Sequence, residues 1–316
     1  MNRNTLLVLI KSVVVVGSIA FIIQSVRKRP ELLDFFYDPA SLLVSSFAFA
    51  TACLLMLLNW SLEAMKWRIL VNAVEPIGFL KSFFSIMSGV TASLIGPNRT
   101  GEFVGRVLHV SEGNRIKASL CTIPGSLSQL MVTMVFGLLS LPFVTSPFAQ
   151  FGISVQAIVV WLIMAIILLT AAYFLIPGLR ARFQITSMFD RLNGYLSPLF
   201  SYSRSDLIRV LGFSTIRYLV FTTQFFLMLL AFGVEVSVLD GLACIAAIFL
   251  FMALVPGFAI AEFTLRGSVA LYLFAPITAN SAGVLAASSA LWLVNLVLPA
   301  LVGAIAIYAV KTDSTP

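Results

Sequence analysis

Two short segments of the sequence each combine a glutamate with an arginine four residues later. Glu102 precedes Arg106 in the first segment, and Glu262 precedes Arg266 in the second. This spacing places both side chains on one face of a helix, within reach of an ion pair. Each pair could neutralise itself and lock its own segment, or it could orient an arginine toward a polar cavity. We favour the cavity, because the nearby Arg99 has no acid at helical spacing except Glu102, which is already engaged.

These residue types are suited to binding phosphate. A planar guanidinium forms forked hydrogen bonds to phosphate oxygens. Asn98 and Arg99 come just before Thr100, where a half-helix could begin. The first turn of such a helix presents free backbone N–H groups and the positive end of the helix dipole. We therefore predict that Asn98, Arg99, Glu102 and Arg106 bind an anionic headgroup, with Glu262 and Arg266 forming an opposite gate.

The composition shows what surrounds these charges. Of the 316 residues, 60% are hydrophobic and 10% are charged. A soluble domain has about 45–50% apolar and about 25% charged residues. The chain has too little charge to cover a surface in water, so we predict an all-α polytopic membrane protein. Its net charge of +7 is dispersed between apolar runs rather than gathered in a stripe, which argues against nucleic acid as a partner.

Further polar residues fall near or inside apolar runs. Arg217 could guide the headgroup inward, or its side chain could snorkel to the membrane interface, and we prefer snorkelling. Gln129, Asn59 and Glu63 could line a path or hydrogen-bond a neighbouring helix, and the pattern leaves both open. Arg217 and Gln129 complete the set of candidate substrate-binding residues.

The elements that position these residues follow from the lengths of the apolar runs. A hydrocarbon core of about 30 Å needs roughly 20 apolar residues per helix. Six ranges are long enough to be full transmembrane helices, namely 5–26, 40–59, 118–145, 155–177, 210–233 and 283–310.

Two further apolar regions, 79–116 and 241–277, are interrupted by proline and glycine. A broken backbone is tolerated in lipid only where protein or a watery cavity satisfies its polar groups. Paired broken segments in the two halves of a transporter are a pointer to its binding site. We predict two re-entrant helical hairpins that form an inverted repeat, and the alternative is that both breaks are plain surface loops.

The distribution of basic residues favours the hairpins. If the first hairpin enters from the cytoplasm and the second from the opposite side, the outer gaps hold only Arg27, Lys28 and Arg29. Most other basic residues between the spans then lie in the cytoplasm, as the positive-inside rule predicts. We therefore expect both termini in the cytoplasm, and a bacterial inner membrane is the simplest location.

Two ranges are rich enough in charge to be cytoplasmic surface segments of this single membrane domain, 61–75 and 178–209. The second is typical of an amphipathic helix lying on the membrane. Trp60 and Trp67 lie beside and within the first, where they would suit the aromatic belt at the interface.

The segment from Gly96 to Arg106 resembles the P-x-R-x-G-E signature, with an arginine soon after, of the lysylphosphatidylglycerol synthase transmembrane family. This family is the flippase-like domain of the bacterial multiple peptide resistance factor and its stand-alone relatives. The helix from Ala118 with Pro124, and the later segment from Pro256 to Glu262, resemble its downstream pattern of small residues followed by a glutamate. The resemblance implies a stand-alone lipid translocator.

Residues and resemblance together predict a protein, not an enzyme, that moves an anionic or phosphate-bearing lipid through a polar cavity between the two broken helices. The alternatives are a membrane enzyme acting on a lipid-linked substrate and a non-catalytic membrane subunit that recruits a partner enzyme. The single histidine and three dispersed cysteines predict no metal and no cofactor. The expected partner is a membrane phospholipid or lipid-linked substrate, and homo-oligomerisation is left open.

Overall fold

The computed structural model describes residues 39–94, 100–144, 154–178, 190–255 and 259–309, together with residues 16 and 20. Every regular element in these ranges is helical. Within them, five helices are long and apolar enough to cross a membrane: Ser46–Val71, Glu112–Phe143, Val155–Gly178, Arg204–Ala231 and Ser281–Ala309. The prediction of an all-α polytopic membrane protein is confirmed, and the predicted span 5–26 lies outside the described residues.

The helix α3 (Pro39–Val71) continues well beyond the predicted span 40–59. The expectation that 61–75 is a surface segment is wrong for residues 61–71, because Glu63, Lys66 and Trp67 are all buried. The sequence between Trp60 and Val71 contains no proline or glycine that would end the helix. Its charges can leave water because they pair with one another and with cations of other helices.

The first broken region folds back on itself. Helix α4 (Phe79–Ser93) and helix α5 (Gly101–Val107) lie side by side, and residues 95–99 between them are outside the described residues. A Cβ atom at Gly101 would lie 1.9 Å from the Ala92 carbonyl oxygen, and one at Gly105 would lie 2.3 Å from that of Ser88. The two helices therefore run antiparallel with their backbones in close contact. Whether this hairpin re-enters a membrane stays a prediction.

The second broken region has the same layout. Helix α13 (Val238–Leu254) is followed by α14 (Ala259–Phe274), with residues 256–258 outside the described residues. The Cys244 thiol near the start of α13 donates to the Leu273 carbonyl near the end of α14 at 3.4 Å. The two helices thus also run antiparallel.

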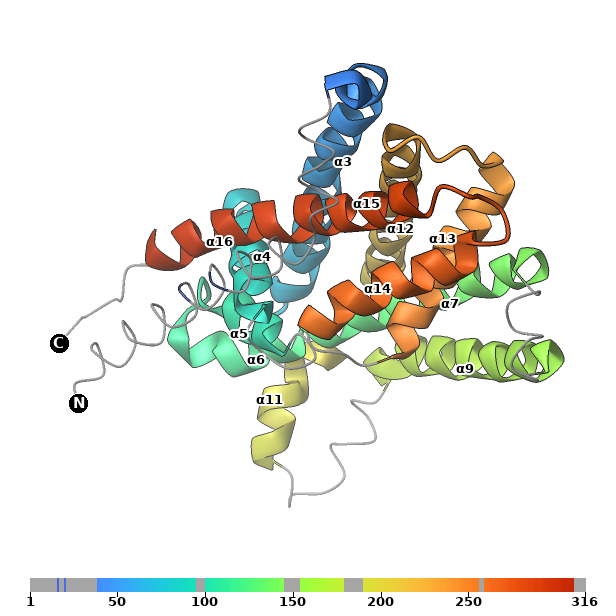
Figure 1. Cartoon of the computed structure of the whole chain (residues 1–316). Helices are drawn as coiled ribbons and strands as arrows, with labels where there is room; N and C mark the ends of the chain where they lie inside the picture. The colour runs from blue at the N-terminus through green and yellow to red at the C-terminus, as the bar shows by residue number, and fades with distance from the viewer. Residues whose placement is uncertain are drawn as a thin grey trace.

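The remaining helices pack against these hairpins and against one another (Figure 1). Helix α12 (Arg204–Ala231) packs along α3, and Gln224 donates to the Ala52 carbonyl at 2.7 Å. Helix α7 (Thr122–Ser140) contacts both α12 and α13, and α9 (Val155–Leu175) lies beside α7 at the edge of the molecule. Helices α15 (Ser281–Trp292) and α16 (Leu298–Ala309) are joined by a π-helical turn, and α16 packs on α4.

The predicted surface segment 178–209 is only partly a separate element. Its described part contains α11 (Asp190–Phe200), which packs against α6 (Arg115–Leu120). Helix α12 already begins at Arg204, because Ser203 and Asp206 form a capping box at its start. Residues 204–209 therefore form the first turns of α12, and whether they lie at the membrane surface stays a prediction.

A carboxylate outside the spans ties the end of α3 to the loop after the first hairpin. Glu75 accepts hydrogen bonds from the Ser111 backbone N–H at 3.0 Å and the Asn114 amide at 3.3 Å, and its other oxygen pairs with Lys81 at 3.1 Å. Partial desolvation opposes ionisation, but the hydrogen bonds from Ser111, Lys81 and Asn114 outweigh it and lower the pKa of Glu75 to about 2. The ionised form of Glu75 is thus the one that holds the loop.

We expect Glu75→Gln to lower the melting temperature in detergent at pH 7 by about 2 °C, the shift for a loss of about 1 kcal/mol in a chain of this size. The pKa of Glu75 lies below the ordinary 4.5. The stabilisation is therefore complete above pH 4.5 and lost as the pH falls toward 2. Differential scanning fluorimetry should show a smaller difference between the two proteins at pH 3, and an equal difference at both pH values would contradict this origin.

Candidate functional site

A cavity of about 370 Å³ lies where α3, α5, α7, α12, α13, α14 and the π-helical turn approach one another. Of the predicted site residues, Glu102, Arg106, Gln129, Arg217 and Arg266 line it. The cavity therefore gathers side chains from both hairpins.

At its charged end the cavity is organised around Glu63. Its carboxylate is 3% exposed and lies 2.7 Å from Lys66 Nζ, 2.9 Å from Arg106 Nη2 and 3.3 Å from Arg217 Nη1. These three cations come from α3 itself, from α5 and from α12. An unpaired charge at membrane depth costs roughly 2.5–3.5 kcal/mol on insertion scales, and the pairing offsets that cost.

The predicted ion pair between Glu102 and Arg106 is present. One terminal nitrogen of Arg106, Nη2, contacts both Glu102 and Glu63. The close packing of Gly105 on Ser88 fixes α5 against α4 and so sets the position of the neighbouring Arg106. We call the group formed by Glu63, Lys66, Glu102, Arg106 and Arg217 the ion cluster.

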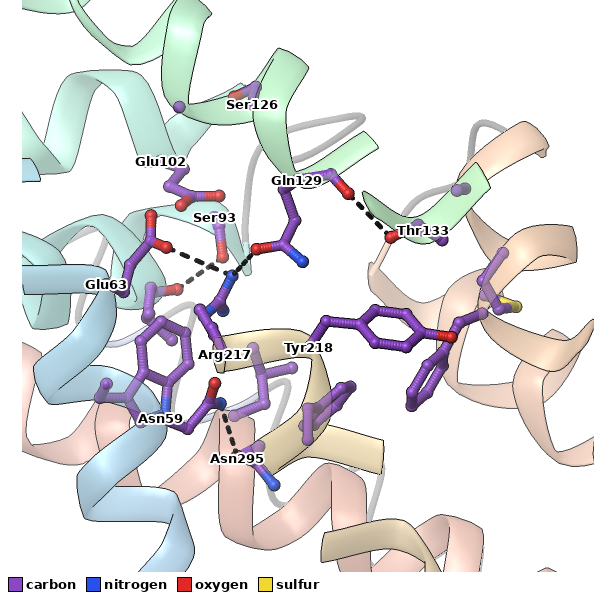
Figure 2. A pocket seen from close by; sticks show the side chains of 18 of the residues that line it. Asn59, Glu63, Ser93, Glu102, Ser126, Gln129, Thr133, Arg217, Tyr218 and Asn295 are labelled. Carbon is purple, nitrogen blue, oxygen red and sulfur yellow. Dashed lines mark hydrogen bonds and ion pairs between the residues drawn. The ribbon is translucent and has the colours of Figure 1, made fainter. Parts of the chain in front are cut away.

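Arg217 points into the cavity, between Glu63 and Gln129 (Figure 2). Its Nη1 atom donates to Gln129 Oε1 at 3.2 Å and contacts Glu63. The preferred interpretation of Arg217 as a snorkelling side chain is wrong. The physical reason is that a buried carboxylate and an amide oxygen lie within reach, so the guanidinium has partners inside the protein.

Two tryptophans of α3 fix the planes of the two arginines. The Arg217 guanidinium carbon lies 5.3 Å from the centre of the Trp60 ring, and that of Arg106 lies 5.8 Å from the centre of Trp67. The tryptophans are two helical turns apart on α3 with Glu63 between them. One face of a single helix thus carries both supports and the shared carboxylate. Cation–π contact of this kind is strongest where water is excluded.

An amide pair extends the polar wall to the C-terminal helices. The Asn59 amide donates to Asn295 Oδ1 at 3.2 Å, and the Asn295 amide donates to the Leu291 carbonyl at 3.1 Å. Asn295 lies in the π-helical turn Leu293–Val297. Pro299 has no N–H for the carbonyl four residues earlier, which explains the irregular turn at this position.

The opposite wall of the cavity is apolar and aromatic. Tyr218 follows Arg217 on α12 and points away from Glu63 (Figure 2). Its ring stacks on Phe136 at 4.6 Å, and Phe221 stacks on Phe249 at 5.0 Å. Tyr218, Phe221 and Phe249 all line the cavity. The cavity is therefore amphipathic, with the ion cluster at one end and aromatic rings at the other.

The ion cluster carries more positive than negative charge, with three cations against two carboxylates. The buried Nε atoms of Arg106 and Arg217 have no hydrogen-bond partner among the described residues. A buried donor without an acceptor is destabilising by about 1–3 kcal/mol. Both arginines line the cavity, so their guanidinium groups could bind an oxyanion there, whereas no group of three or more metal-binding side chains occurs in the described ranges.

The structure describes the remaining predicted site residues only in part. Arg266 of α14 lines the cavity and is 8% exposed. Asn98 and Arg99 lie outside the described residues, as does the side chain of Glu262. Their roles stay predictions.

Sequence reasoning missed Lys66 and the two tryptophans as parts of the site, and it left Glu63 undecided. The available signal was the spacing of Trp60, Glu63, Lys66 and Trp67, which places aromatic and charged side chains three, six and seven residues apart on one helix. Asn295 carried no comparable signal beyond the proline four residues later.

Comparison with known protein families gives a match over most of the chain. A family model described as the lysylphosphatidylglycerol synthase TM region matches residues 8–308. No match was found among curated proteins or among solved structures. The matched range contains the whole cavity.

Proposed function

Because the chain belongs to the lysylphosphatidylglycerol synthase transmembrane family, we propose that it is a flippase-like translocator of a phosphate-bearing membrane lipid. The lipid headgroup enters the cavity and binds to the ion cluster. The expected location is a bacterial inner membrane.

The observation that carries this proposal is the state of the two arginines. Arg106 and Arg217 both line the cavity, and each guanidinium group lies over a tryptophan ring. A phosphodiester has two non-bridging anionic oxygens, which the planar fork of a guanidinium can bind together. The excess positive charge of the ion cluster favours an anion over a neutral or cationic group.

The amphipathic wall supports a lipid as the source of this phosphate. The rings of Tyr218, Phe221 and Phe249 provide an apolar surface for the part of the molecule that adjoins the headgroup. Both carboxylates of the ion cluster are engaged by cations, which favours binding over general acid–base chemistry. We therefore propose transport rather than catalysis.

The test is translocation by the purified protein in liposomes of phosphatidylcholine. Fluorescent phosphatidylglycerol or fluorescent phosphatidylcholine is added as a tracer, and quenching from outside reports how much has crossed. We expect phosphatidylglycerol, a monoanionic phosphodiester, to move faster than in protein-free liposomes and faster than the zwitterionic tracer. If neither tracer moves faster than in protein-free liposomes, the proposed function is wrong.

We expect Arg217→Gln to slow phosphatidylglycerol translocation by about tenfold, since it removes one charge-assisted contact of about 1.5 kcal/mol. The matched control is Arg209→Gln, which removes the same charge from the same helix at an exposed position outside the cavity. Equal rates for the two variants in the liposome assay would show that overall charge, not the cavity, sets the rate.

A further inference from the structure

Glu63 occupies the place on the arginines that an incoming phosphate would need. One of its oxygens lies 2.9 Å from Arg106 Nη2 and the other lies 3.3 Å from Arg217 Nη1. Among the ion pairs of the described residues, Glu102 contacts Arg106 and not Arg217. Among the described ion pairs, Glu63 is thus the carboxylate that joins both arginines. An anion that binds both must compete with it.

The surrounding contacts allow Glu63 to be displaced without leaving its charge unpaired. Lys66, three residues further along α3, lies 2.7 Å from the carboxylate, which is the shortest of its three contacts. The arginines are also held independently of Glu63 by Trp60 and Trp67. Loss of the glutamate contact would therefore leave the Glu63–Lys66 pair intact and the guanidinium groups in position.

We propose that Glu63 is a built-in competitor of the lipid phosphate at Arg106 and Arg217. This inference rests on the proposed function. The headgroup binds by taking the arginines from Glu63, which stays paired with Lys66, and it is released when Glu63 returns. A transport site must bind its substrate strongly enough to admit it and weakly enough to let it leave. The Glu63 carboxylate can replace the phosphate oxygens on the two arginines, and this competition limits how tightly the lipid is held.

Removal of the competitor is expected to tighten binding. The deciding variant is the double substitution Glu63→Gln with Lys66→Met, which removes one charge of each sign and leaves the net charge of the cavity unchanged. Binding of dihexanoyl phosphatidylglycerol to the protein in detergent should become tighter by about tenfold, a factor that corresponds to about 1.4 kcal/mol. Phosphatidylglycerol translocation in liposomes should become slower, because release is then the slow step.

Two further variants separate competition from simple electrostatics. Glu63→Gln alone should also tighten binding, and if loss of a buried ion-pair partner prevents it from folding, the double variant decides. Glu102→Gln makes the same change of charge in the same cavity but frees only Arg106. We expect it to tighten binding less than Glu63→Gln does.

The outcomes distinguish this inference from the proposed function. If the wild-type protein neither binds nor moves phosphatidylglycerol, the proposed function fails. If it binds the lipid but the folded double variant binds it equally or more weakly, only the role of Glu63 is wrong. Glycerol 3-phosphate, a soluble phosphate ester, is measured in the same binding assay as the lipid. Binding as tight as that of the lipid would identify a site for a free phosphate ester and would contradict the lipid assignment.

Discussion

Arg106→Lys is expected to preserve the fold and yet to slow phosphatidylglycerol translocation by between about tenfold and a hundredfold, the range for one lost contact of about 1.5–3 kcal/mol. Lysine keeps the positive charge that Glu63 and Glu102 require. It has no planar fork and no Nε donor, so it cannot grip two phosphate oxygens as arginine does. The loss should therefore appear in lipid binding and transport rather than in stability.

The control for this variant is Arg115→Lys, which makes the same exchange at a half-buried arginine beside Glu112, outside the cavity. Scanning fluorimetry of both variants should give melting temperatures close to that of the wild type, and the liposome assay should separate them. If Arg106→Lys transports phosphatidylglycerol at the wild-type rate, the guanidinium fork is not the phosphate-binding group. A truncation such as Arg106→Ala is less informative, because unpairing buried carboxylates costs about 3–5 kcal/mol.

The helical architecture could be predicted because hydrocarbon imposes simple lengths and patterns. Five spans and the Glu102–Arg106 pair follow from apolar run length and from the spacing of four residues, both of which are local. The prolines and glycines that interrupt the two further apolar regions likewise predicted that each region forms two helices, as α4 and α5 and as α13 and α14 do. Each of these signals lies within a short stretch of chain.

The centre of the site could not be predicted in the same way. Charges near the end of an apolar run ordinarily seek water, so Glu63 and Lys66 suggested a surface segment. Their burial depends on Arg106 and Arg217, which are brought to α3 only when α5 and α12 pack against it. Pairing across helices is a tertiary event, and the spacing of residues within α3 does not identify their partners on α5 and α12. Arg217 was misassigned for the same reason.

In the ion cluster, side chains of α3 hold the arginines of α5 and α12 in position before a ligand binds. Trp60 and Trp67 lie under the guanidinium groups of Arg217 and Arg106, and Glu63 lies between them. The arginines are therefore ordered before any headgroup arrives, and that reduces the entropy cost of binding. This ordering also makes the site sensitive to small shifts of α5, whose position depends on close backbone packing.

Gly105→Ala is accordingly expected to impair both stability and transport. The added Cβ would lie 2.3 Å from the Ser88 carbonyl oxygen and 2.7 Å from the Gly89 Cα, and backbone atoms cannot turn aside as a side chain can. Overpacking of this kind costs about 1–3 kcal/mol, so the melting temperature should fall by about 2–6 °C. Because α5 must move away from α4, Arg106 is displaced from Glu63 and translocation should slow as well.

Gly212→Ala is the matched comparison, since it adds the same methyl group within α12 at a position where nothing lies within 4 Å. Alanine is favoured over glycine inside a helix by about 0.5–1 kcal/mol, so this variant should be as stable as the wild type or slightly more so. The melting temperatures of the two variants are measured by scanning fluorimetry, and their translocation rates are measured in the liposome assay. If Gly105→Ala matches Gly212→Ala in both measurements, the α4–α5 contact does not determine where Arg106 lies, and the link from backbone packing to the ion cluster is wrong.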